Sequence, residues 1–294
     1  MKVLITGATG RLGRELAARA PENADIEALI EPTDQSVPDS KWFRADITEP
    51  DRLLMAVTCS EPDIIIHLAA MTNVDGCERD PEAANRINRD GSANIARAAV
   101  ECGAGLLYVS TDYVFDGRHG PYTEDDEPNP ICEYGRSKLE GEQVVSSIVD
   151  GSTIIRISVP FGTRRQGTGH NYVSWLIEEF SAGNTLRIVD DQYTTPSYLP
   201  ELADVLWILA DKRVPGVVHY GTGDRLSRYE MALIVCEVMG YSGDFIEPVK
   251  TADMGFTAPR PLESGFVTDK ILEITGTTPI LYRNALYRMI EETG

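Results

Sequence analysis

The stretch KVLITGATGRLG at residues 2–13 decides the fold expected for this chain. Its first part, Lys2–Thr6, is an apolar run rich in β-branched residues, which predicts a buried strand. Leu12, Leu16 and Ala20 then recur at helical spacing, so they predict one apolar face of a helix that begins directly after the glycines. The order of strand, glycine-rich turn and helix predicts an α/β fold that opens on a βα unit.

The glycines of this turn are spaced GxxGxxG, at Gly7, Gly10 and Gly13. They permit a tight turn, close approach of a pyrophosphate and close helix packing, while the helix N-terminus offers N–H donors to an anion. Three glycines in a loop are often only turn formers, but the flanking strand and helix favour a dinucleotide site. The residues expected to form it are Gly7, Thr9, Gly10, Arg11, Leu12 and Gly13.

The charge balance narrows the possible ligands. The 294 residues hold 27 Lys and Arg against 46 Asp and Glu, a formal net charge of −19. Such a chain repels nucleic-acid phosphates and anionic lipid, so we expect neither as a partner. An anionic small molecule would need a local site of backbone N–H groups and a few cations. The excess of carboxylates fits an ordinary solvated acidic face or a salt-rich cytoplasm.

Cysteine and histidine spacing indicates neither a disulfide framework nor a metal site. The five cysteines are an odd number without a CxxC pair, and the four histidines lack metal-ligand spacing. No metal is therefore expected. The first apolar run is too short for a signal peptide, and no run approaches the roughly 20 apolar residues of a membrane span. We expect a cytoplasmic protein.

Apolar β-branched runs alternate with helical patterns over the first half of the chain. This alternation predicts a Rossmann-type, doubly wound parallel sheet. After residue 160 the pattern is less regular, with helices expected at 171–182, 202–210 and 227–239 and strands at 186–189 and 217–220. We therefore divide the chain into a dinucleotide-binding domain, 1–160, and a smaller mixed substrate lobe, 161–294, with some crossing back. The further strands expected in the first part are 26–30, 64–67, 106–110 and 153–157.

Acidic residues follow two of these strands. Glu31 could accept both hydrogen bonds of an adenosine ribose diol and would repel a 2′-phosphate, which favours NAD over NADP. It could equally be a solvated loop residue, with Arg11 or Lys41 covering a phosphate. Asp46 and Ile47 could contact the adenine, although an Asp that caps the next helix explains the first of them as well.

A second motif combines a phenol, an ammonium and a hydroxyl. Tyr134 and Lys138 are four residues apart, so a helix places them on one face, where the cation can lower the pKa of the phenol for proton transfer. Thr111 follows the strand 106–110, at the edge where open α/β sheets bind ligands. A surface helix pair is the alternative reading of Tyr134 and Lys138. Together with a dinucleotide, the three residues predict a reductase site.

These motifs together resemble the extended short-chain dehydrogenase/reductase family. Within it, four segments are similar to the signatures of the dTDP-4-dehydrorhamnose reductase subfamily, and the similarity covers nearly the whole chain. The segments are HLAAMTNVD at 67–75, STDYVFDG at 110–117, DQYTTP at 191–196 and RPL at 260–262. The resemblance implies NAD(P)H-dependent reduction of the 4-keto group of a nucleotide-linked 6-deoxysugar, by an enzyme expected to be a homodimer.

The resemblance also implies roles for individual residues. Thr111 would donate a hydrogen bond to the carbonyl, Tyr134 would be the general acid, and Lys138 would tune its pKa and bind the nicotinamide ribose. Asn88 would support a proton-relay water. Leu68, Ala69 and Ala70 would line the cofactor channel. The residues expected to contact the substrate are Thr72, Val74, Asp112, Asn171 and Arg260.

The same residues weigh against two neighbouring activities. Nucleotide-sugar dehydratases typically have Thr-Asp-Glu at this strand end, because elimination needs an additional carboxylate. This chain has Tyr113 in place of that Glu, and the segment 113–116 departs from the pattern of the epimerases. A simple reductase fits better.

Two departures from the reductase pattern leave the sugar open. Val159 follows Ser158 where the subfamily usually has a Trp that contacts the sugar, and Arg164 and Arg165 either face a diphosphate or form a solvated loop tip. One alternative is a reductase or epimerase of another nucleotide sugar. The other is a non-catalytic, dinucleotide-binding protein that resembles the regulatory subunit of methionine adenosyltransferase. His67, at the end of a strand, is expected to be a buried packing residue.

Overall fold

The computed structural model describes residues 1–34, 42–164 and 168–293. Lys41 and Arg165, which the sequence analysis considered as contacts of a phosphate, lie outside the described residues.

A seven-stranded parallel sheet organises the chain around the glycine-rich turn. Its order is β11-β6-β5-β4-β1-β2-β3, so the chain winds outward in both directions from the neighbouring strands β1 and β4. This confirms the predicted doubly wound, Rossmann-type α/β fold, in which ligands bind at the carboxyl edge of the sheet. The strands are β1 (Lys2–Thr6), β2 (Asp25–Ile30), β3 (Trp42–Arg44), β4 (Ile64–His67), β5 (Gly105–Thr111), β6 (Thr153–Ile157) and β11 (Gly216–Tyr220).

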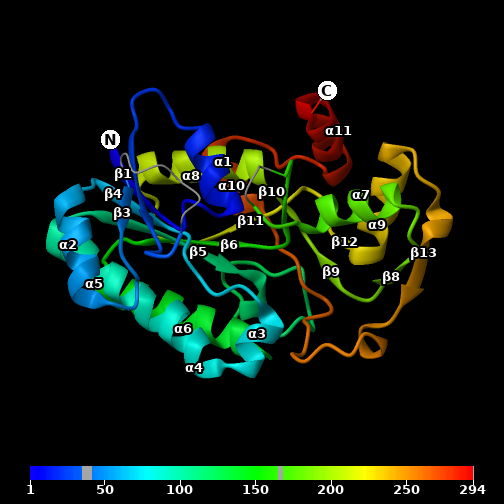
Figure 1. Ribbon diagram of the computed structural model, residues 1–294, viewed down its shortest axis with the longest axis horizontal. Coiled ribbons are helices and arrows are strands. Elements are labelled where there is room, and N and C mark those ends of the chain that lie inside the picture. The colour runs from blue at the N-terminus through cyan, green and yellow to red at the C-terminus, as the bar shows by residue number, and fades with distance from the viewer. Residues whose placement is uncertain (35–41, 165–167, 294) are drawn as a thin grey trace.

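Helices cover both faces of this sheet (Figure 1). Side chains alternate along a strand, so Val3 and Ile5 pack into one apolar core while Leu4 packs into the other. The first core is closed by α1 (Arg11–Ala18), α8 (Leu199–Lys212) and α10 (Asp269–Thr275). The second core is closed by α2 (Pro50–Ser60), α5 (Ser92–Cys102) and α6 (Glu133–Ile148).

The smaller lobe is built from short strand pairs and helices beside the carboxyl edge of the sheet (Figure 1). Phe161, Leu176, Met231 and Val235 belong to its separate apolar core. Its helices are α7 (Tyr172–Ser181), α9 (Arg228–Met239) and α11 (Tyr282–Thr293). Its strand pairs are β7 (Pro160–Phe161) with β10 (Ser197–Tyr198), β9 (Tyr193–Thr194) with β12 (Leu226–Ser227), and β8 (Leu186–Val189) with β13 (Ile246–Val249).

The chain crosses between the two parts after residue 160. α8 and α10 cover the main sheet, and β11 extends it by pairing in parallel with β6. Two short helices, α3 (Val74–Arg79) and α4 (Pro81–Asn85), and a π-helix, η1 (Arg86–Gly91), connect β4 to α5. Among the described helices, none is long and apolar enough to cross a membrane.

Candidate active site

A cavity of about 1020 Å³ lies at the carboxyl edge of the main sheet, and we call it the edge cavity. Its walls come from the turn after β1, the ends of β2, β4, β5 and β6, and the first turns of α6. The predicted cofactor residues that line it are Gly7, Thr9, Gly10, Arg11, Leu12, Gly13, Glu31, Asp46, Ile47, Leu68, Ala69 and Ala70. The predicted catalytic and substrate residues that line it are Thr111, Tyr134, Lys138, Thr72, Val74 and Asp112.

The glycine-rich turn is shaped by close backbone contacts. Gly7 has φ +65°, and a Cβ there would lie 2.8 Å from the backbone nitrogen of Ala69. A Cβ on Gly13 would lie 2.5 Å from the Cα of Ala8, so a side chain would push α1 away from the turn. Gly10 precedes α1 without a side-chain cap, which leaves the N–H groups of the first helical turn to other acceptors. This cradle fits the pyrophosphate of a dinucleotide.

Polar groups at the ends of β2 and β3 border the same cavity. Glu31 is exposed, and one of its carboxylate oxygens accepts a hydrogen bond from the Thr33 hydroxyl at 3.0 Å. Asp46 accepts hydrogen bonds from the backbone nitrogen and the hydroxyl of Thr48, both at 2.8 Å. Arg11 donates to the carbonyl of His170 at 2.9 Å, which links the glycine-rich turn to the loop before α7.

A buried histidine orders the wall that follows β4. His67 Nδ1 lies 2.6 Å from the Thr6 hydroxyl and Nε2 lies 3.0 Å from the Ser92 hydroxyl. The same Thr6 oxygen accepts hydrogen bonds from the backbone nitrogens of Leu68 and Ala69, which face the cavity. Burial lowers the pKa of His67 to about 3, so the ring is neutral. His67 is a packing residue that fixes the cofactor wall.

Thr111, Tyr134 and Lys138 are brought together from β5 and α6. Thr111 is the last residue of β5, and its hydroxyl donates to a carboxylate oxygen of Asp112 at 3.3 Å. Tyr134 and Lys138 lie on the first turns of α6, which begins at Glu133. All three side chains are buried at the wall of the edge cavity. Buried polar groups at a cavity wall are candidates for chemistry with a bound ligand.

The electrostatics of Tyr134 differ from the sequence-based expectation. Burial raises the pKa of Tyr134 well above its usual value, and a hydrogen bond with Thr111 only partly opposes this effect. We expected Lys138 to lower that pKa, but Lys138 donates instead to the carbonyl of Val109 at 2.8 Å and lies over the ring of Tyr108. The phenol therefore stays protonated at neutral pH, which suits a proton donor.

Lys138 itself is strongly affected by its surroundings. Burial lowers the pKa of its ammonium to about 7, while the negative charge of Glu142 acts in the opposite direction. Its nitrogen is 4.0 Å from the centre of the Tyr108 ring, so a cation–π contact supports the charged form. With a pKa of about 7, this group is present in both its charged and its neutral form near neutral pH.

Asp112 and Asn88 connect separate segments of the chain around the edge cavity. One carboxylate oxygen of Asp112 accepts from the hydroxyls of Ser158 at 2.6 Å and Ser264 at 2.9 Å, and burial raises the pKa of this carboxyl. Asn88 lies in the π-helix, where its side chain pairs with both backbone groups of Met71 and donates to the Ser137 hydroxyl at 2.9 Å. Asn88 thus connects the wall after β4 to the helix that carries Tyr134 and Lys138.

Two predicted substrate residues lie away from the lining of the edge cavity. Asn171 caps α7: its side-chain oxygen accepts from the backbone nitrogen of Ser174 at 3.0 Å. Arg260 donates to the carboxylate of Asp75 at 2.8 Å and lies over the Phe256 ring. The structure gives both side chains intramolecular partners instead of bringing them to the cavity.

Two arginines that line the edge cavity were not predicted as site residues. Arg228, at the start of α9, reaches the cavity from the smaller lobe, and Arg86 reaches it from the π-helix. Neither belongs to a recognisable motif, and an isolated arginine in a sequence carries no signal of its place in the fold. Val159 stands at the position where the reductase subfamily usually has a Trp. It also lines the cavity and has φ +41°, a rare conformation for a β-branched residue. No group of three or more potential metal ligands occurs in the described residues.

Comparisons with known proteins agree with the geometry over the whole chain. The family model described as the RmlD substrate binding domain matches residues 1–294. The dTDP-4-dehydrorhamnose reductase of Mycobacterium tuberculosis is 35% identical over 294 residues, which cover 97% of this chain and 91% of the relative. Methionine adenosyltransferase 2 subunit beta of Danio rerio is 31% identical over 295 residues, 97% of this chain and 88% of the relative.

Solved structures show the same likeness. A crystal structure of dTDP-4-dehydrorhamnose reductase from Bacillus anthracis in complex with NADP aligns with a TM-score of 0.88 at 31% identity. The alignment covers 99% of each chain.

Proposed function

The chain belongs to the family of the RmlD substrate binding domain, and on this premise we propose that it reduces the 4-keto group of a nucleotide-linked 6-deoxysugar. It is a nicotinamide-dinucleotide-dependent oxidoreductase of the extended short-chain dehydrogenase/reductase type. The observation that carries this proposal is the meeting of Thr111, Tyr134 and Lys138 in one cavity with the glycine-rich turn. The family membership and the motifs support the same chemistry.

The side chains divide the reaction between them. The dinucleotide, when bound on the glycine-rich turn, supplies the hydride that reduces the carbonyl carbon. The Thr111 hydroxyl donates a hydrogen bond to the carbonyl oxygen, and the protonated Tyr134 phenol transfers its proton to that oxygen as the alcohol forms. Lys138, on the same helix and held by the carbonyl of Val109, would bind the nicotinamide ribose of the dinucleotide.

For the cofactor, we propose NADH in preference to NADPH. The support is the exposed carboxylate of Glu31 at the end of β2, where it borders the edge cavity. A carboxylate accepts hydrogen bonds from a ribose diol and repels a 2′-phosphate. Glu31→Ala should therefore raise KM for NADH and lower KM for NADPH. Equal KM values for the two cofactors in the unsubstituted protein would contradict this preference.

The test of the reduction is direct. NADH and NADPH oxidation is followed with enzymatically generated dTDP-4-dehydro-6-deoxyhexose at low and high salt, and the product is identified by NMR. If the product keeps the configuration of the keto sugar at C3 and C5, the protein is a simple reductase and not an epimerase. Protein that is folded and binds dinucleotide but turns over no keto sugar would contradict the proposal.

A second candidate function rests on one specific observation, the 31% identity to Methionine adenosyltransferase 2 subunit beta. On that reading the chain binds a partner enzyme and catalyses nothing. The presence of all three side chains at the cavity wall favours the reductase, because a purely regulatory protein has no use for a buried, protonated phenol beside a hydroxyl. Co-purification with a methionine adenosyltransferase, together with the absence of hydride transfer to any keto sugar, would favour the regulatory function.

A further inference from the structure

An arginine of the smaller lobe stands at the edge cavity without an acidic partner. The chain carries 46 acidic against 27 basic side chains, and two other arginines of this lobe, Arg225 and Arg283, pair with Glu263 and Glu237. Arg228 lines the cavity and has no carboxylate within ion-pair distance in the part of the chain that the structure describes. In an acidic protein, such a cation at a cavity is a local site for an anion.

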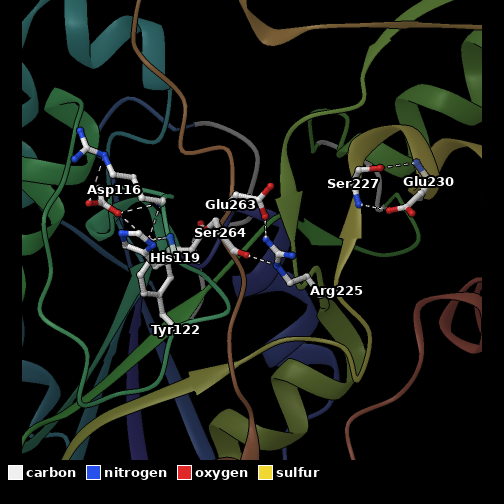
Figure 2. Close-up of polar contacts among 10 residues, drawn as sticks. Asp116, His119, Tyr122, Arg225, Ser227, Glu230, Glu263 and Ser264 are labelled. Carbon is white, nitrogen blue, oxygen red and sulfur yellow. Dashed lines mark hydrogen bonds and ion pairs between the residues drawn. The ribbon is translucent and has the colours of Figure 1, made fainter.

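The backbone at Arg228 is held rigidly. It is the first residue of α9, directly after Ser227, whose hydroxyl and backbone nitrogen form a capping box with Glu230 (Figure 2). The backbone nitrogen of Arg228 donates to the carbonyl of Gln192 at 3.0 Å. The hydroxyl of Tyr172 donates to the carbonyl of Arg228 at 2.8 Å.

The guanidinium is held as well. Its central carbon lies 4.9 Å from the centre of the Tyr172 ring, so the cation lies over an aromatic face. This contact restricts the side chain without using its N–H donors. The guanidinium is therefore preorganised to present those donors to a ligand, and less entropy is lost on binding.

The position of Arg228 indicates which ligand it meets. Beyond residue 170, the described residues that line the edge cavity are Leu199 and Arg228, so Arg228 is the charged group that the smaller lobe contributes. Its charge acts on Asp112 and Tyr113, which directly follow Thr111. The pyrophosphate cradle of the dinucleotide lies elsewhere, on the turn after β1. Arg228 thus belongs to the substrate end of the cavity.

We propose that Arg228 is a specificity-determining residue that binds an anionic oxygen group of the nucleotide sugar. The group is a phosphate of the nucleoside diphosphate, which matches the planar fork of a guanidinium. This inference rests on the proposed function for the identity of the ligand class. It goes beyond that function because it assigns recognition of that phosphate to one unpredicted side chain.

Arg228→Gln is the decisive variant, with Arg283→Gln as the matched control. Arg283 is paired with Glu237 on the surface of the same lobe, so its replacement removes one positive charge away from the cavity. The expected result is a rise of roughly 10- to 100-fold in KM for the keto nucleotide sugar in Arg228→Gln, from the loss of a charge-assisted hydrogen bond. KM for the dinucleotide should change less than about two-fold. Arg228→Lys, which keeps the charge but not the fork, should recover only part of the loss.

Calorimetric binding tests the phosphate assignment and does not depend on turnover. If Arg228 binds a phosphate, Arg228→Gln weakens binding of dTDP itself. Unchanged dTDP binding, with loss of a preference for UDP-glucuronate over UDP-glucose, would instead assign Arg228 to a sugar carboxylate and overturn the phosphate assignment.

The inference is overturned if Arg228→Gln matches Arg283→Gln in all of these measurements, or if the unsubstituted protein binds none of the three nucleotides. Failure of the proposed function looks different, because nucleotide binding would then persist, and respond to Arg228→Gln, without reduction of any keto sugar.

Discussion

At the scale of single residues, Tyr134 tests the chemistry most directly. Its buried phenol has a raised pKa and remains a proton donor at neutral pH. Tyr134→Phe removes the transferable proton and keeps the ring, so kcat should fall by a factor on the order of 10² to 10⁴. Dinucleotide binding, measured by fluorescence titration, should be unchanged. An unaltered kcat would exclude Tyr134 as the general acid.

Lys138 gives a pH-dependent prediction at the same scale. Its pKa is about 7 in the folded protein and near the ordinary 10.5 in the unfolded chain, because burial disfavours the ammonium. Between these values the unfolded state binds a proton that the folded state does not, so this group makes the folded protein more stable as pH rises.

Relative to Lys138→Met, the free energy of unfolding of the dinucleotide-free protein should therefore increase from pH 7 to 10.5. The increase is up to roughly 1.4 kcal/mol per pH unit. Urea unfolding of both proteins at several pH values measures it. A difference that stays constant across this range would show that Lys138 is not buried as a neutral amine.

At the scale of elements, the junction of β1 and α1 depends on Gly13. A Cβ at this position would meet backbone atoms of Ala8 and Gly7 at 2.5–2.6 Å, so the helix must move. Gly13→Ala should weaken dinucleotide binding at least ~10-fold and destabilise the fold by about 1–3 kcal/mol. Gly243→Ala is the control, because a Cβ there makes only an ordinary contact with Leu233 at 3.6 Å. Equal effects of the two substitutions would contradict the role of Gly13.

At the scale of the whole molecule, two buried histidines make the free energy of unfolding depend on pH in the acid range. Burial lowers the pKa of both His67 and His219 to about 3, while the unfolded chain titrates near 6.5. Below pH 6.5 the unfolded state binds protons that the folded state excludes. The contribution of the two neutral histidines to the free energy of unfolding is therefore fully present above pH 6.5 and is lost progressively toward pH 3.

His67→Gln should reduce the slope of unfolding free energy against pH between pH 6 and 4.5 by up to about 1.4 kcal/mol per unit. The range above pH 4.5 limits interference from carboxylates, which titrate mainly at lower pH. Urea unfolding of both proteins at each pH measures the slope. An unchanged slope would mean that His67 is accessible to protons in the folded state.

The sequence by itself determined the parts that depend on local pattern. Short runs rich in apolar, β-branched residues located β1, β4 and β6 to the residue, because a strand buried on both faces is mostly apolar along its length. The GxxGxxG spacing placed the turn at the carboxyl edge, since each glycine meets backbone within the same βα unit or the adjacent strand end. The fold class and the cavity that unites Thr111 with Tyr134 and Lys138 followed from this winding order.

Only the tertiary structure decided the features that depend on contacts between distant segments. Arg260 pairs with Asp75 and Asn171 caps a helix, although both stand in segments that looked suited to a substrate. Arg228 enters the cavity from the start of α9, where its backbone nitrogen is bonded to the carbonyl of Gln192, and the pKa of Tyr134 is raised because the folded chain encloses it. Burial and long-range pairing are properties of the packed molecule, and no local pattern encodes which partner a side chain will meet.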